Sequence, residues 1–333
     1  MRVTVPDFYE EFHCLAGACP HTCCEKWEVV IDGETARRYL EVPGLLGQRL
    51  RAALQTDSDG DQCFALSGGR CPFLNGENLC AIHCALGQQA TSVTCREHPR
   101  FTEDYGPFRE ITLSASCPEA NRLLLSGNAP LDFHSTETDE PGEEGDAWLP
   151  GLLALRARLI GLLQDRAHPL RARLWSFLSV AAAAQARLDE EEPEEAAAVP
   201  ALPLVPAEEG VFPAALDFLA GLECLDADWP QLLAAAAEER GGGAEEALLE
   251  RIAVYFAFRY LLKAVNDGDV LARAEFTVFA VLTVERLAGV CGLAEGLRRF
   301  SAEIEHDEDN LNALLDALRW DFGVERLAAE LAL

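Results

Sequence analysis

The sequence predicts a mainly α-helical protein, in which a small cysteine-rich α+β module at the N-terminus precedes an all-helical body. Two observations carry this prediction. Ten of the 12 cysteines lie within the first 117 of the 333 residues. The remainder is rich in Ala and Leu, and its apolar residues recur at helical spacing. We therefore expect a metal- or cluster-binding module over residues 1–126, a linker over 127–148 and a helical domain over 149–333.

Short elements are expected within the N-terminal module. Residues 27–32 (WEVVID) read as a strand, and a short helix should follow over 33–40. Residues 106–114 alternate weakly and predict a second strand. Proline and glutamate after Cys117 are helix start signals, and they predict a helix that ends near Ser126.

The rest of the chain reads as helices with two polar interruptions. The linker at 127–148 is polar and contains Pro and Gly. Residues 189–210 form an acidic, low-complexity run, which we expect to be an exposed and poorly ordered connector. Helices are expected over 150–167, 169–187, 213–222, 229–239, 243–265, 269–290, 293–304, 307–319 and 322–332.

The charge of the chain excludes several functions. The formal net charge is −29, of which −6 lies in residues 1–125 and −23 in the rest. Such an acidic chain repels phosphate backbones, so no nucleic-acid partner is expected. No stretch approaches the roughly 18–20 uncharged apolar residues of a membrane span, and acids stand where a signal peptide would be apolar. A cytoplasmic location is expected, while the oligomeric state cannot be read from the sequence.

In the cytoplasm, dense cysteine indicates metal binding or catalysis more often than disulfides. The spacing excludes several metal sites. No C-x2-C occurs, although zinc ribbons and RING-like modules are built on it. The C-x3-C-x2-C triplet of radical enzymes that bind S-adenosylmethionine is also missing, because Cys24 directly follows the Cys19-x3-Cys23 pair.

What remains is a site whose ligands come from separated stretches of the chain. Thiolates bind iron–sulfur clusters or zinc, and ligand type alone does not choose between them. Of the adjacent Cys23 and Cys24, only one should face a given metal, and any single cysteine can instead be a small buried residue. Four histidines, His13, His21, His83 and His98, lie among them as further donors. The candidate metal ligands are Cys14, Cys19, Cys23, Cys24, Cys71, Cys80, Cys95 and Cys117.

Five motifs in fixed order resemble the bacterial flagellin lysine-N-methylases. The first is F-x-C-x4-C-x3-CC-x2-W, which begins at Phe12 and is followed by Ile31-Asp32. CPFL at 71–74, LC-x-I at 79–82, TC-x3-PR at 94–100 and LS-x2-CPEA at 113–120 complete the series. A shorter version of this series resembles small zinc- or iron-chelating proteins. The resemblance is dense over 8–125 and diffuse over the helical remainder, where Arg259-Tyr260 and Glu305-His306-Asp307 look like family features.

The resemblance implies a protein-lysine methyltransferase that uses S-adenosylmethionine and carries a [4Fe-4S] cluster, with zinc as the alternative metal. Its substrate would be flagellin or another lysine-bearing protein. Cys63 and Cys84 fall outside the family pattern and are doubtful ligands. No catalytic base is identified, although Glu97, Glu119 and Tyr105 lie near the motifs as candidates.

Two other functions compete with the enzyme. The protein could bind zinc or iron for storage, sensing or delivery, or hold a structural metal in a partner-binding protein. The long helical body argues against a pure chelator, which has no evident need for it. In each case the candidate cysteines should converge in space, because metal binding can offset the entropy of closing long loops. Cys224 and Cys291 are expected to be core residues of the helical body.

Overall fold

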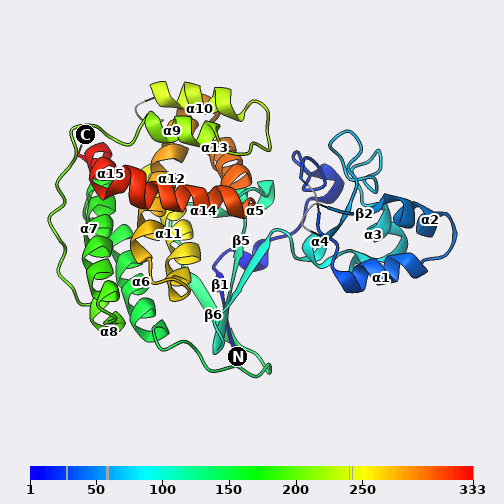
Figure 1. The fold of residues 1–333 in the computed structure, drawn as a ribbon, viewed down its shortest axis with the longest axis horizontal. Coiled ribbons are helices and arrows are strands. Elements are labelled where there is room, and N and C mark those ends of the chain that lie inside the picture. The colour runs from blue at the N-terminus through cyan, green and yellow to red at the C-terminus, as the bar shows by residue number, and fades with distance from the viewer. Residues whose placement is uncertain (28, 58–59, 240, 242, 333) are drawn as a thin grey trace. The chain divides into compact units, whose positions relative to one another are not determined.

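The computed structural model describes residues 1–27, 29–57, 60–239, 241 and 243–332, and the chain forms two compact units (Figure 1). Both units are discontinuous, so they do not follow the expected boundary at residue 126. The first 11 residues belong with the larger unit, and a four-residue piece of the chain returns to the smaller one. The larger unit comprises Met1–Glu11, Thr102–Ser116 and Asn121–Leu333, and the smaller one Phe12–Phe101 and Cys117–Ala120.

A four-stranded sheet accounts for much of this difference. Its order is β4 (Arg100–Asp104), β5 (Phe108–Leu113), β1 (Arg2–Pro6) and β6 (Phe133–Glu137). β1 pairs in parallel with β5 and antiparallel with β6. The strand expected over 106–114 is confirmed by β5. The expected linker is wrong over β6, because this polar segment completes the sheet. The helical body expected over 149–333 is confirmed in its described residues, since every strand of the sheet precedes it in the chain.

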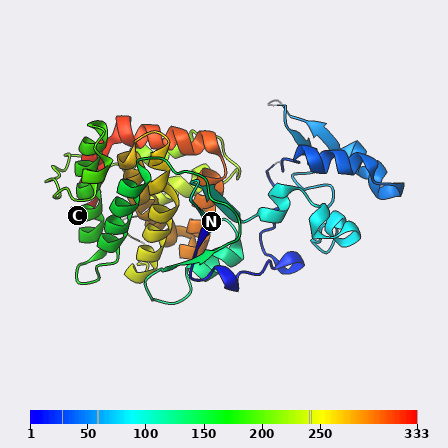
Figure 2. The same ribbon diagram turned by 90° about the horizontal axis from the view of Figure 1, so that it is seen from below.

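The helices of the larger unit follow the predicted periodicity closely. Helices α6, α7, α11 and α12 pack against one another, as both ribbon views show (Figures 1 and 2). Short 3-10 or π turns extend several of them, and the described part of 213–333 contains no strand. The helices are α5 (Pro118–Leu124), α6 (Leu149–Leu163), α7 (Leu170–Asp189), α9 (Ala214–Ala220), α10 (Trp229–Glu238), α11 (Glu246–Tyr260), α12 (Val270–Cys291), α13 (Leu293–Phe300), α14 (Glu308–Asp316) and α15 (Gly323–Leu331).

The acidic run over 189–210 is more ordered than expected. It contains a short helix, α8 (Pro193–Ala196), and it buries Ala196 and Val199 against the larger unit. Arg158 donates to the carbonyl oxygen of Val199 at 2.6 Å. The prediction of a fully exposed connector is wrong for this first half, because small apolar side chains are interleaved with the acids. Most residues after Val199 in this run are exposed, as expected.

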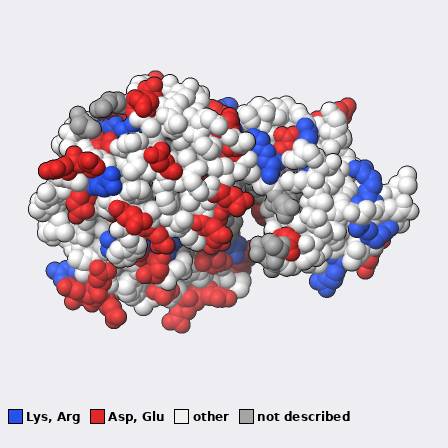
Figure 3. All heavy atoms as spheres, turned by 45° about the horizontal axis from the view of Figure 1, so that its top comes forward, with Lys and Arg blue, Asp and Glu red and all other residues white. Residues whose placement is uncertain are grey.

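Acidic side chains cover much of the visible face of the larger unit (Figure 3). This distribution agrees with the charge of −29 for the chain. Among the helices that the structure describes, none is both long enough and apolar enough to cross a membrane.

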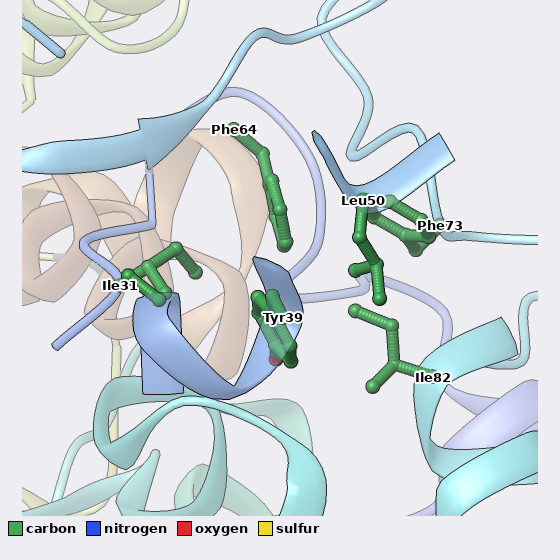
Figure 4. Close-up of a cluster of buried hydrophobic side chains, with 7 residues drawn as sticks. Ile31, Tyr39, Leu50, Phe64, Phe73 and Ile82 are labelled. Atoms are coloured by element: carbon green, nitrogen blue, oxygen red, sulfur yellow. The ribbon is translucent and has the colours of Figure 1, made fainter. Parts of the chain in front are cut away.

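The smaller unit is built around a compact apolar cluster. Ile31, Tyr39, Leu50, Phe64, Phe73 and Ile82 point toward one another (Figure 4). The helix expected over 33–40 is confirmed by α1. The strand expected over 27–32 is wrong: residue 28 lies outside the described residues, and only Val30 forms an isolated bridge, with Cys63. The elements are α1 (Gly33–Glu41), α2 (Gly44–Ala53), β2 (Leu54–Thr56), β3 (Gln62–Phe64), α3 (Ala81–Leu86) and α4 (Val93–Glu97).

Glu275 on α12 should make the stability of the larger unit depend on pH. Its side chain is fully buried, and neither carboxyl oxygen has a hydrogen-bond partner among the described residues. Desolvation raises the pKa of this carboxyl from 4.5 to about 9, against a smaller opposing effect of the Arg319 charge. At a pH between 4.5 and about 9, the Glu275 carboxyl is ionised in the unfolded chain but stays protonated in the folded chain. The free energy of unfolding therefore falls as pH rises through this window.

Replacing Glu275→Gln should remove this contribution, because an amide does not titrate. Urea unfolding at pH 6 and pH 8.5 measures this effect. From the lower to the higher pH, the free energy of unfolding of the variant should rise relative to that of the parent by up to about 3 kcal/mol. The exposed Glu209→Gln is the matched control and should track the parent at both values. Equal pH slopes for the Glu275 variant and the parent would contradict a protonated Glu275.

Candidate metal centre

Backbone pairing brings the CC, CPFL and LC motifs together in the smaller unit. The N–H of Cys71 donates to the carbonyl oxygen of Cys24 at 2.8 Å. Leu74 forms an isolated antiparallel bridge with Cys80, and the two cysteines of this loop pack against the apolar cluster. Cys24, Cys71 and Cys80 therefore lie close together although 56 positions separate the first from the last.

The carboxylate of Asp32 connects the fourth motif to this arrangement. One oxygen accepts the N–H of Thr35 at 2.9 Å and caps α1. The other accepts the N–H of Val93 at 2.9 Å, at the start of α4. Cys95 lies one turn into α4, where Ser92 accepts its N–H at 3.2 Å. The Ile31-Asp32 pair of the first motif thus positions the helix that carries Cys95.

Several candidate sulfurs accept hydrogen bonds from backbone N–H groups. Cys80 is the N-cap of α3, and its Sγ accepts the N–H of His83 at 3.5 Å. Cys14 Sγ accepts the N–H of Ala16 at 3.4 Å. The thiol of Cys117 accepts the N–H groups of Glu119 and Ala120 at the start of α5. Such donors stabilise thiolates, and hydrogen bonds to sulfur are typical of thiolate-held metal clusters.

Four of these thiols influence one another's ionisation, namely Cys24, Cys71, Cys80 and Cys95. The pKa of Cys71 is raised to about 12, mainly by desolvation, and that of Cys95 is raised to about 11 for the same reason although its side chain keeps contact with solvent. Neighbouring thiolate charges add to both shifts. The thiols that act on Cys71 are Cys24, Cys95 and Cys80, and those that act on Cys95 are Cys24 and Cys80.

The remaining candidates, Cys14, Cys19, Cys23 and Cys117, also influence one another's ionisation. Desolvation raises the pKa of Cys117, and the thiolate charges of Cys19 and Cys14 raise it further. The pKa of Cys23 is raised by its hydrogen bond to Cys24 and by desolvation, with the charge of Cys14 among the further causes. That hydrogen bond lowers the pKa of Cys24 to about 7. The adjacent pair therefore interacts with thiols of both groups.

All eight candidate cysteines thus lie in the smaller unit, and none of them forms a disulfide. Within the described residues, however, no group of three or more Cys, His, Asp or Glu side chains is arranged to hold a metal ion. The convergence of these cysteines on one metal therefore stays a prediction. The donor chemistry fits a thiolate-bound centre, since backbone pairing connects several of the motifs and the sulfurs of Cys14 and Cys80 accept N–H groups.

The other cysteines have different surroundings. Cys63 is fully buried in β3, where Gln55 donates to its sulfur at 3.6 Å, so it acts as a core residue of the smaller unit. Cys84 is exposed one turn after Cys80. Cys224 and Cys291 are only half-buried, so the expectation that they are core residues of the helical body is wrong.

The histidines among the cysteines differ in exposure. His13, His21 and His83 are exposed. His98 is more enclosed, with its ring 6.2 Å from that of Trp27, and desolvation lowers its pKa to about 4. Its imidazole is therefore neutral at physiological pH, which is the form that binds metals.

The candidate bases are placed unequally. Glu97 is exposed at the end of α4, whereas Glu119 is buried beside Cys117. The hydroxyl of Tyr105 is buried with no hydrogen-bond partner within the described residues, and desolvation raises its pKa. Tyr105 therefore stays protonated at neutral pH and is a poor base.

The family-like residues of the helical body form a buried polar network, which sequence reasoning noticed but did not connect. Glu305 accepts from the hydroxyls of Tyr255 at 3.1 Å and Tyr260 at 2.9 Å, and its Oε1 lies 3.0 Å from Arg259 Nε. Tyr255 in turn accepts the N–H of Ala115 at 3.4 Å. The network thereby binds the segment that leads into Cys117.

His306 extends this contact with the same segment. Its Nε2 lies 2.8 Å from Ser114 Oγ and 2.7 Å from Ser116 Oγ. Asn121 donates to the carbonyl oxygens of Ala115 and Ala294, each at 3.0 Å. Residues on both sides of Cys117 are therefore fixed by the larger unit.

A hollow of about 670 Å³ lies elsewhere in the larger unit, between Phe108 and Leu149 with acids such as Glu143 at its wall. None of the candidate cysteines lines it. It contributes nothing to the thiol arrangement.

Comparison with known proteins identifies three relatives. The flagellar biosynthetic protein FliU of Salmonella muenchen is 29% identical over 132 residues, which are 38% of this chain and 78% of that protein. The lysine-N-methylases of Salmonella typhimurium and Salmonella choleraesuis are each 29% identical over 132 residues, which are 38% of this chain and 33% of the methylase. No family model and no solved structure matches the chain.

Over this stretch the chain is therefore related to proteins named lysine-N-methylase and to a flagellar biosynthetic protein, which confirms the resemblance of the five motifs. The matched stretch is about a third of the length of the two lysine-N-methylases.

Removing the Asp32 carboxylate should loosen the smaller unit. In Asp32→Ala, the N-cap of α1 and the acceptor of the Val93 N–H at the start of α4 are both lost, so the free energy of unfolding of this unit should fall by about 1–3 kcal/mol. Amide hydrogen exchange resolves the effect, which should be concentrated in α1 and α4. The exposed Glu34→Ala in the first turn of α1 is the control. Unchanged protection of α4 would show that the contact with Val93 does not hold it.

Removing the Glu305 carboxylate should lower the free energy of unfolding more than removing that of Asp32. In Glu305→Ala, Arg259 and two buried phenols lose their shared acceptor, and we expect a loss of about 3–5 kcal/mol in the free energy of unfolding. Chemical denaturation followed by circular dichroism measures it. The exposed Glu308→Ala should change stability by less than about 0.5 kcal/mol. A Glu305 variant as stable as this control would disprove the network's structural role.

Proposed function

We propose that this protein is a protein-lysine N-methyltransferase that acts on flagellin or another lysine-bearing protein. In this proposal S-adenosylmethionine is the methyl donor, and cysteines of the smaller unit hold a [4Fe-4S] cluster. The observation that carries the proposal is the relationship to two proteins named lysine-N-methylase. The ordered motifs and the gathering of their cysteines in one unit support it.

The reaction sets a demand on the protein. The lysine nitrogen attacks the methyl carbon of the sulfonium, so an N–C bond forms as the C–S bond breaks, and the nitrogen then gives up a proton. An ε-ammonium with its usual pKa of about 10.4 has no free electron pair for this attack. The site must lower that pKa by burial or supply a base.

The surroundings of the thiols are suited to lowering the pKa of a substrate lysine by burial. Desolvation is the largest cause of the raised pKa values of Cys71, Cys80 and Cys117, so this part of the unit disfavours buried charge. An ammonium brought into the same surroundings would lose its proton more readily. Glu119 is the candidate best placed to act as a base, since it is buried in the first turn of α5 close to Cys117 in sequence.

The candidate cysteines would hold the cluster through their thiolates. When bound by three of them, a [4Fe-4S] cluster supplies an electrophilic iron with an open coordination position. The protein's own part would be to reduce the cost of ionising these thiols. The backbone N–H groups near Cys80 and Cys117 act in this direction and oppose part of the desolvation that raises both pKa values.

Methylation should depend on the cluster-facing cysteines. After anaerobic purification, Cys71→Ala, Cys80→Ala and Cys95→Ala should each lose the iron–sulfur absorbance and at least about 100-fold of the methylation of a lysine-bearing flagellin, as ligand loss at metal centres commonly costs. Incorporation of labelled methyl from S-adenosylmethionine measures the activity. The matched controls Cys224→Ala and Cys291→Ala remove half-buried thiols of the larger unit and should retain both signals.

Two outcomes would contradict the proposal in different ways. A cluster-free Cys80→Ala protein with full methyltransferase activity would refute the role of the cluster. A metal-loaded parent protein that methylates no lysine of any flagellin offered would refute the enzymatic function and favour a metal-binding role.

A further inference from the structure

The hollow beside Phe108 and Leu149 has no part in the arrangement of the thiols. Its volume is about 670 Å³, and all the residues that line it belong to the larger unit. Sites that bind small ligands commonly enclose about 300–1,000 Å³. The hollow is therefore large enough to take several side chains of a ligand, and its lining indicates which chemistry it accepts.

Part of this lining is apolar. Phe108 lines the hollow from β5, and Leu149 and Leu153 line it from the first two turns of α6. Phe108 and Leu149 are buried, whereas Leu153 is half-buried. Surfaces of this kind cover the methylene stems of lysine and arginine while the charged ends stay at the edge.

Three carboxylates also line the hollow. Glu137 ends β6, and Glu143 and Asp146 come from the loop before α6. All three are exposed, and none forms an ion pair with a basic side chain within the described part of the chain. The segment 139–146 carries five acids and neither lysine nor arginine. Negative charge therefore surrounds the apolar lining.

Two positive groups lie near these carboxylates. The guanidinium of Arg2 lies over the ring of Phe108, 5.0 Å from its centroid. The terminal ammonium donates to the carbonyl oxygens of Thr138 and Glu140, at 3.1 and 2.6 Å. With three carboxylates against these two groups, the lining stays negative. The position of Arg2 also shows that a cation is accepted over this ring.

A smaller hollow of about 300 Å³ adjoins the first, since Met1 and Glu143 line both. In it the guanidinium of Arg109 lies 3.0 Å from the carboxylate of Asp104 and 3.1 Å from that of Glu140. The chain thus binds one of its own cations here between carboxylates. Because acids line both hollows, an extended segment with several positive charges matches them better than a compact cation.

The acidic loop is fixed against the turn between β4 and β5. The N–H of Glu143 donates to the carbonyl oxygen of Gly106 at 2.9 Å. A Cβ at Gly145 would lie 2.9 Å from side-chain atoms of both Leu149 and Pro107, so only glycine allows this close packing. The loop that carries the carboxylates is therefore held in place, which reduces the entropy lost when a ligand binds.

We propose that the hollow is a docking site for a short basic segment of another protein. Lysine or arginine side chains of this segment place their stems against Phe108 and Leu153 and their charged ends beside Glu137, Glu143 and Asp146. The proposal rests on the proposed function only in identifying the segment as part of the lysine-bearing protein substrate. The docking itself requires neither methyl transfer nor a metal.

Peptide binding tests this docking site. The full chain is titrated into a short fluorescein-labelled peptide of alternating lysine and alanine, and fluorescence anisotropy gives the dissociation constant. The parent protein should bind this peptide but not its counterpart with glutamate in place of lysine, and added salt should weaken the binding. Failure to bind the lysine peptide, or equal binding of the glutamate peptide, overturns the proposal.

Neutralising the three carboxylates should weaken the binding. Glu137→Gln, Glu143→Gln and Asp146→Asn combined should raise the dissociation constant about tenfold, because each exposed ion pair contributes little alone. Asparagine at position 146 keeps an oxygen that accepts the N–H of Trp148, so the start of α6 is preserved.

A matched control is needed because acidic side chains cover much of the visible face of the larger unit (Figure 3). Glu208→Gln, Glu209→Gln and Glu238→Gln combined remove the same charge from exposed positions that do not line the hollow. This control should change the dissociation constant by less than about twofold, because distant exposed charges are screened by salt. A control that binds as weakly as the variant of the hollow would overturn the proposal.

A substitution that fills the hollow separates its shape from its charge. Leu153→Trp places a larger side chain in the hollow and should remove most of the binding at unchanged charge. Ala154→Trp adds the same side chain at the next, exposed position of α6, which does not line the hollow, and should bind as the parent does. A Leu153→Trp protein with the parent's affinity would show that the peptide binds elsewhere.

These results are distinguishable from those of the proposed function, because peptide binding is measured without S-adenosylmethionine. A protein that binds the lysine peptide in the hollow but methylates no flagellin would keep the docking site and refute the enzyme. A methyltransferase whose peptide binding ignores the changes in the hollow would do the reverse.

Discussion

The two hydrogen bonds accepted by the Asp32 carboxylate are the constraint on which the arrangement of the cysteines depends. They fix the start of α1 and the start of α4 to a single side chain, at 2.9 Å each. Desolvation opposes ionisation of this carboxyl, but the donors outweigh it and lower its pKa. Asp32 is therefore ionised at neutral pH, and its contribution to stability is lost only as pH falls through that lowered pKa. Without it, the helix that carries Cys95 would lose its hydrogen bond to the start of α1.

The small core of this unit explains why additional constraints are needed. A single cluster of seven buried residues, among them Tyr39 and Phe73, supports a chain that is largely loops and short helices. Small units of this kind commonly gain stability from disulfides or metals. Here the cysteines form no disulfide, and the sulfurs of Cys14 and Cys80 already accept backbone N–H groups. Metal binding by these thiols would thus stabilise the fold as well as supply chemistry.

Local periodicity was enough to predict the helices of the larger unit, because each of them buries a face that repeats along its own sequence. The same reasoning failed wherever the structure depends on distant partners. Arg2 pairs with Phe108 on one side and with Glu137 on the other, and nothing near Arg2 indicates either partner. The polar composition of β6 therefore predicts a linker instead of a strand. The sequence likewise assigns the first 11 residues to the cysteine-rich module, whereas they belong to the larger unit. Glu305 and Arg259 were noticed separately, but only the structure shows that they form an ion pair.

The spacing of the motifs indicated which cysteines belong together but not how each is placed in the fold. Cys23 and Cys24 are adjacent in sequence, yet the hydrogen bond between them raises the pKa of Cys23 and lowers that of Cys24. Cys117 shows why the rest of the chain matters. It belongs to the smaller unit, yet Ser116 before it and Asn121 after Ala120 are both bound within the larger one. The residues that flank this thiol are thus held within the larger unit, through His306 and the network around Glu305.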